Sequence, residues 1–102
     1  MDPEIPDLIS TADVVISTAG RDKGMYFYVI KEEQQYLYLV NGKNRQLDKP
    51  KRKKRKHVQK VLRSETRVAD KLRAGDKVLN SELRRDLAFL SREMQSNDLG
   101  GF

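Results

Sequence analysis

Residues 14–30 of this chain, VVISTAGRDKGMYFYVI, decide the fold. The run at 14–18, β-branched except for Ser17, and the apolar and aromatic run at 25–30 are typical of two β-strands. Between them lies the basic loop 20–24, which has a glycine at each end. Glycine adopts positive φ angles without steric cost, and Asp22 can bond its own backbone. The stretch therefore predicts two strands joined by a tight turn.

A third strand-like run, YLYLV at residues 36–40, is followed at once by the dipeptide NG at 41–42. This dipeptide is a strong hairpin signal, and residues 45–47 provide a short return strand. Residues 51–56 have no apolar face, which indicates a loop or an extended edge of the sheet. The alternating residues 57–61 predict a fifth strand. Short strands joined by tight turns favour a small β-barrel.

The hydrophobic period changes to that of a helix in the C-terminal third of the chain. Residues 64–74 predict a short helix, with Ser64 as its N-cap and Gly75 at its C-terminal end. A longer helix begins at Asn80 or Ser81. An isolated helix of this length is marginal in water, so its apolar stripe needs a partner surface. The stripe consists of Leu83, Leu87, Leu90 and Met94.

All four tyrosines fall at even positions on the second and third predicted strands. Because side chains alternate between the faces of a strand, an even register, such as one with Tyr28 opposite Tyr36, would put all four on one face. Two roles for that face stay open: it stacks unpaired bases, or it packs against the C-terminal helices. The residues that would then point into the barrel are Phe27, Val29, Leu37 and Leu39.

The basic residues are concentrated in one segment. The chain has 21 Lys and Arg residues against 15 Asp and Glu, a formal net charge of +6. Nine of the basic residues lie at 49–63, where there is no acidic residue, so the remainder carries a net charge of −3. Such a patch concentrates the field where a polyanion can dock. For residues 49–56, here called the basic ridge, a solvated charge run and a nuclear import signal remain alternatives.

The composition argues against several classes of site. With no cysteine there is neither a disulfide nor a thiolate zinc site, and the lone His57 supports no metal site. No nucleophile–base pair is recognisable, so we expect no catalytic residue, no metal, no cofactor and no small-molecule substrate. The acidic, proline-broken N-terminus is unlike a signal peptide, and no apolar run reaches membrane-spanning length. These features predict a cytoplasmic protein.

The motif AGRDKG at 19–24, with Tyr26-Phe27 after it and apolar strands on both sides, resembles the KOW motif of RNA-binding ribosomal and transcription proteins. Through the NG dipeptide, the block KPKRKK at 49–54 and His57, the chain is also similar to a group of large-subunit ribosomal proteins and to small bacterial KOW-containing RNA-binding proteins. The likeness covers residues 12–61, about half the chain. It implies a small SH3-like barrel that contacts structured RNA, often in the ribosome.

The expected fold class is mainly β with C-terminal α, namely a small SH3-like (KOW) β-barrel followed by two helices. The chain then divides into four segments. They are an N-terminal extension at 1–11, the barrel with its basic ridge at 12–63, two helices at 64–95 and a flexible tail at 96–102.

The expected function is non-enzymatic binding of ribosomal or other structured RNA, with ribosomal proteins as further partners. The alternative is a protein-interaction module of the transcription or translation machinery, which docks on polymerase or a ribosomal protein through the C-terminal helix. The expected turn residues are Gly20, Gly24, Asn41 and Gly42. The expected RNA-binding residues are Arg21, Lys23, Lys43, Arg45, Lys49, Lys51, Arg52, Lys53, Lys54, Arg55, Lys56 and Lys60.

Overall fold

The computed structural model describes residues 8–100, and the side chains of residues 8–94. Within this part of the chain, no helix is both long and apolar enough to cross a membrane. The elements are β1 (Asp13–Ser17), β2 (Tyr26–Glu32), β3 (Tyr36–Val40), β4 (Lys51–Lys54), the short 3-10 helix η2 (Arg55–His57), β5 (Val58–Arg63), α1 (Arg67–Ala74) and α2 (Asn80–Gly100).

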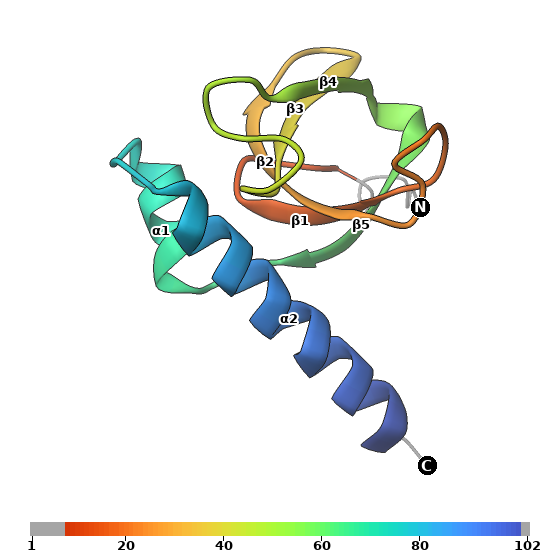
Figure 1. The fold of residues 1–102 in the computed structure, drawn as a ribbon. Helices are drawn as coiled ribbons and strands as arrows, with labels where there is room; N and C mark the ends of the chain where they lie inside the picture. Colours follow the sequence, from red (N-terminus) through yellow and green to blue (C-terminus); the bar gives the residue numbers. More distant parts are fainter. Residues whose placement is uncertain (1–7, 101–102) are drawn as a thin grey trace.

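The strands form one antiparallel sheet in the order β4-β3-β2-β1-β5. The sheet curls strongly, and η2 joins the edge strand β4 to the edge strand β5 (Figure 1). Among the described residues β4 and β5 do not pair with each other, so the sheet is open. The expected class, mainly β followed by two helices, is confirmed.

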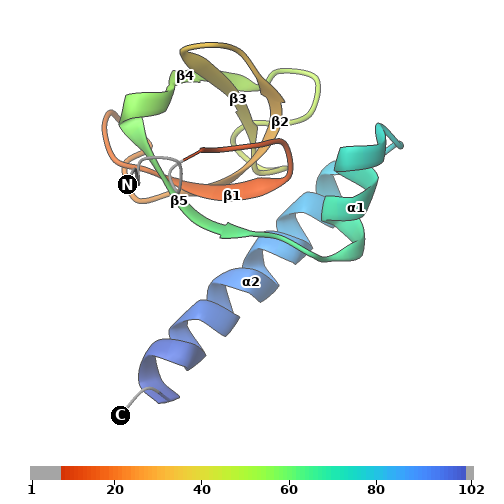
Figure 2. The same ribbon diagram turned by 180° about the vertical axis from the view of Figure 1, so that it is seen from behind.

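Two clusters of buried side chains lie on opposite faces of the sheet, because neighbouring residues of a strand point to opposite sides. The cluster inside the curl contains all four residues predicted there, Phe27, Val29, Leu37 and Leu39. The other cluster joins the outer face of the sheet to the two helices, and α2 continues beyond the strands (Figure 2). It includes Val14, Tyr28 and Val40 from the sheet, and Leu83 and Leu87 from α2.

The sheet is therefore the partner surface that the helical stripe needs. Leu83 and Leu87 are buried in the outer cluster, and Leu90 packs against its margin. Burying a leucine side chain contributes about 1.5–3 kcal/mol as an upper estimate. Residue Met94 is half-buried, farther along the same helix.

The four tyrosines share the outer face of the sheet, as an even register requires: Tyr26 and Tyr28 lie at the outer cluster, and on β3 Tyr36 and Tyr38 alternate with the inward-pointing leucines. Tyr28 lies opposite Val40 instead of Tyr36, and a bulge between Val29 and Lys31 shifts the pairing of the two strands. Tyr28 is fully buried under the helices, which settles its role as packing. Tyr36 and Tyr38, at the start and the middle of β3, remain half-exposed.

Asn41 and Gly42 lie in a turn, as predicted, and their N–H groups donate to the Arg45 carbonyl oxygen at 2.9 and 3.0 Å. The tight two-residue hairpin and the return strand at 45–47 do not form. Gly42 does have a positive φ of 77°, but Asn41 uses its side-chain oxygen to accept hydrogen bonds from the backbone N–H groups of Lys43 and Arg45, both at 3.0 Å. This arrangement stabilises a longer loop that ends at Pro50. The strand that pairs with β3 is β4, formed by the basic ridge itself, so the edge interpretation of 51–54 is the correct one.

The helix boundaries agree in part with the prediction. Gly75 closes α1 with a φ of 76°, but Thr66 is the N-cap, since Ser64 instead hydrogen-bonds the Tyr28 hydroxyl at 2.8 Å. α2 begins at Asn80, as expected. It continues to residue 100, so most of the predicted tail at 96–102 is helical, and residues 101–102 lie outside the described part, as do residues 1–7 of the N-terminal extension.

Candidate functional site

The loop between β1 and β2 is a rigid turn. Gly20 and Gly24 have φ angles of 86° and 90°, as their predicted turn role requires. The Gly24 N–H donates to the Ser17 carbonyl oxygen at 2.8 Å, and the Met25 N–H to that of Asp22 at 2.9 Å. The loop is thus held at its base, while the side chain of Arg21 at its tip is exposed.

Asp22 anchors this loop to the opposite edge of the sheet. Its carboxylate accepts a hydrogen bond from the Ser17 hydroxyl at 2.7 Å and pairs with the Lys53 ammonium at 2.6 Å. The same ammonium donates to the Ala19 carbonyl oxygen at 2.7 Å. Burial by itself would raise the pKa of Asp22, but the hydrogen bonds from Lys53 and Ser17 outweigh it and hold the pKa below its usual value.

The structure does not place Lys53 on the exposed ridge, where the sequence put it. Its side chain is only 8% exposed and points into the loop. Two more predicted RNA-binding residues are also held by the protein itself. Arg55 donates to three backbone carbonyl groups, including that of Glu33 at 2.9 Å, and Lys60 pairs with the buried Asp13 at 3.2 Å.

Strand alternation divides the rest of the ridge between two faces of β4. Lys51 points to the same side as Lys53, opposite Leu39 and Leu37 of β3, whereas residues 52 and 54 point to the outer face. The residues of the basic ridge therefore do not form a single surface, although they are contiguous in the sequence. The predicted residues that lie exposed are Arg21, Lys23, Lys43, Lys49, Arg52, Lys54 and Lys56.

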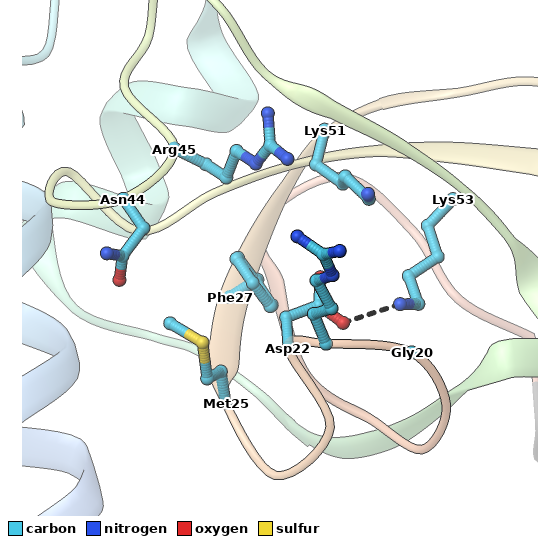
Figure 3. Close-up of a pocket in the computed structure, with 9 residues that line it drawn as sticks. Gly20, Asp22, Met25, Phe27, Asn44, Arg45, Lys51 and Lys53 are labelled. Atoms are coloured by element: carbon cyan, nitrogen blue, oxygen red, sulfur yellow. Dashed lines mark hydrogen bonds and ion pairs between the residues drawn. The ribbon is translucent and has the colours of Figure 1, made fainter.

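A pocket of about 300 Å³ opens where the loop, β4 and the 41–50 loop meet; we call it the basic pocket. Arg45 and Lys51 reach into it from two sides, above a floor that includes Met25 and Phe27 (Figure 3). Arg21 lines it from the third side. The full lining is Gly20, Arg21, Asp22, Met25, Phe27, Asn44, Arg45, Lys51 and Lys53.

The pocket is positive because its carboxylate is already neutralised. Asp22 is the one acidic residue among those lining it, and Lys53 holds that charge. Within the described residues, no carboxylate forms an ion pair with Arg21, Arg45 or Lys51. Two guanidinium groups and an ammonium therefore line the pocket without an ion-pair partner from the described part of the chain, which is the arrangement that binds phosphate or carboxylate groups.

The first turns of α2 position the Arg45 side of this pocket. Arg84 donates to the Gly42 carbonyl oxygen at 2.6 Å, and the Asn80 side chain accepts the Leu47 N–H at 2.9 Å. Together they fix both halves of the loop that carries Arg45. Sequence reasoning missed this contribution because the two segments are more than thirty positions apart.

Among the described residues, no group of three or more His, Cys, Asp and Glu side chains is arranged to hold a metal ion. Comparison with protein-family models and with curated proteins finds no match to this chain.

Proposed function

We propose that this protein is a non-enzymatic RNA-binding protein, an SH3-like barrel of the KOW type whose basic pocket holds phosphate groups of ribosomal or other structured RNA. The observation that carries the proposal is the convergence of Arg21, Arg45 and Lys51 from three separate segments on one pocket. The resemblance of the AGRDKG and KPKRKK motifs to KOW proteins supports the same proposal.

Physical chemistry favours a phosphate over other anions at this site. Guanidinium groups bind phosphate oxygens in a bidentate manner, and the pre-formed turn around Gly20 costs little further ordering when the ligand arrives. Contacts of this kind give affinity and orientation with little readout of base sequence. Recognition of structured RNA then rests on the shape of its backbone and on its 2′-hydroxyl groups.

The alternative, docking on a protein through the C-terminal helix, has weaker support. It needs an exposed apolar stripe, but Leu83 and Leu87 are buried against the sheet. The N-terminal half of the stripe thus packs against the sheet of the same chain and is not available to a partner protein.

The test is a charge-matched comparison of two triple variants. One replaces Arg21, Arg45 and Lys51 with Gln; the other replaces Arg67, Lys77 and Arg92, three exposed cations at the helices, in the same way. Binding to a labelled ribosomal RNA hairpin is measured over a salt series. We expect the pocket variant to lower the slope of log affinity against log salt by about 2–3, since each phosphate contact contributes roughly 0.7–0.9.

The control triple should leave the slope close to that of the wild type. Equal losses in both variants would mean that net charge alone attracts the RNA, and the pocket proposal would be rejected. Circular dichroism of all three proteins establishes that the fold is intact.

A further inference from the structure

The outer face of the sheet carries an arginine stacked on a tyrosine. The Arg52 guanidinium carbon lies 3.6 Å from the centroid of the Tyr36 ring. The Arg52 Nε is 3.5 Å from a carboxylate oxygen of Glu33, and the other oxygen of Glu33 accepts the Tyr38 hydroxyl at 3.1 Å. A planar cation is therefore fixed in orientation by a ring below it and a carboxylate beside it.

The outward face of this guanidinium is open to solvent. The Arg52 side chain is 53% exposed although one face of its guanidinium lies on the tyrosine, so the face turned away from the ring is the one available to a ligand. A guanidinium is weakly hydrated and stacks readily on flat π-systems, including nucleobases. Because it is already held flat, little side-chain entropy remains to be lost when a base stacks on it.

The surroundings favour a nucleotide as the occupant. Lys54 is exposed on the same face of β4, and the Lys31 ammonium lies 5.2 Å from the centroid of the neighbouring Tyr38 ring. Cations beside a flat surface complement a base together with its flanking phosphates. Arg52 is less suited to gripping a phosphate itself, since its Nε already faces the Glu33 carboxylate.

We propose that Arg52, stacked on Tyr36, is a platform for one unpaired base of the bound RNA. The proposal rests on the RNA-binding function proposed above and assigns this residue a role different from that of the basic pocket. The pocket contacts phosphates, and the platform selects RNAs in which a base is out of the helix.

The experiment compares two RNA hairpins that differ only in one bulged 2-aminopurine, whose fluorescence falls when it stacks. We expect the wild-type protein to bind the bulged hairpin at least about fivefold more tightly and to quench it, since stacking of a base is worth about 1 kcal/mol or more. Arg52→Lys keeps the charge but removes the plane. It should abolish both the preference and the quenching without changing the salt slope.

The matched control is Lys54→Gln, an exposed neighbour without a tyrosine stack. It should weaken both hairpins alike and retain the preference. If the wild type binds both hairpins equally, or if Arg52→Lys keeps the preference, the platform is refuted while the phosphate pocket stands. If the wild type binds neither hairpin, the RNA-binding proposal fails and the platform with it.

Discussion

Lys51 and Lys53 lie two residues apart on the same face of β4. The same substitution should lower the stability of the protein at Lys53 but only weaken RNA binding at Lys51. Lys53 is 8% exposed and pairs with Asp22, whose side chain is 15% exposed, whereas Lys51 is half-buried at the pocket. Breaking a buried ion pair from one side typically costs about 3–5 kcal/mol. Ser17 still donates to Asp22 and some solvent reaches it, so we expect about 2–3 kcal/mol for Lys53→Met.

For a domain of this size, that loss corresponds to a melting temperature roughly 10–20 °C lower in thermal unfolding followed by circular dichroism. Lys51→Met is the matched control, with the same chain length and charge change. It should melt within a few degrees of the wild type but bind RNA more weakly. Adding Asp22→Asn to Lys53→Met removes the unpaired charge and should restore part of the lost stability.

The cost of Lys53→Met should also depend on pH. The pKa of Asp22 in the folded protein is lowered below its unfolded value of about 3.9. A lowered pKa contributes stability that is fully present above the unfolded pKa and is lost as the pH falls through the folded pKa. The stability difference between wild type and Lys53→Met should therefore be constant near neutral pH and shrink below about pH 4. Equal melting temperatures for the two lysine variants at neutral pH would refute this reasoning.

Two further predictions concern the junction of sheet and helices. Gly42→Ala should destabilise the protein more than Gly75→Ala. Both glycines have a positive φ, which costs an alanine about 1–2 kcal/mol, but only a Cβ at Gly42 would collide with the Asn80 carbonyl oxygen. Equal melting temperatures of the two variants would contradict this packing. Tyr28→Phe removes the hydroxyl hydrogen-bonded to Asp86 and should cost about 1–3 kcal/mol in urea unfolding at neutral pH. Burial raises the pKa of Tyr28 to about 12, above its unfolded value of about 10, so the wild type should lose stability as the pH rises from about 10 through 12. If Tyr28→Phe loses the same stability over this pH range, the loss does not come from Tyr28.

The sequence predicted the strands whose side chains alternate between core and surface. Residues 36–40 match β3, and residues 14–18 match β1 to within one position. It did not predict β4 as the return strand, because KRKK has low strand propensity. The strand forms because its backbone pairs with β3, while an edge position leaves half of its charged side chains in water. Backbone pairing across a ten-residue loop is not visible in local composition.

All three cations of the basic pocket are among the twelve residues predicted to bind RNA, but the sequence does not separate them from the cations that the protein itself pairs. The sequence shows where the positive residues lie, but their counter-charges come from distant positions: Asp22 is 31 residues from Lys53, and Asp13 neutralises Lys60. A count over 49–63 therefore includes lysines that are already paired. The pattern that could have separated them is the period of two within residues 51–54, which puts Lys51 and Lys53 on the inner side.

Helix α2 shapes the basic pocket as well as the outer hydrophobic cluster. Arg21 sits on a loop fixed to β4 by Lys53, and Arg45 on a loop fixed to α2 by Asn80 and Arg84. The loops that carry Arg21 and Arg45 are thus each held by an element other than their own, and removing α2 would release the Arg45 side of the pocket. Positioning within a few tenths of an ångström decides whether guanidinium groups bind a phosphate in a bidentate manner. The sheet without its helices would keep its net positive charge but lose the arrangement of side chains that shapes the pocket.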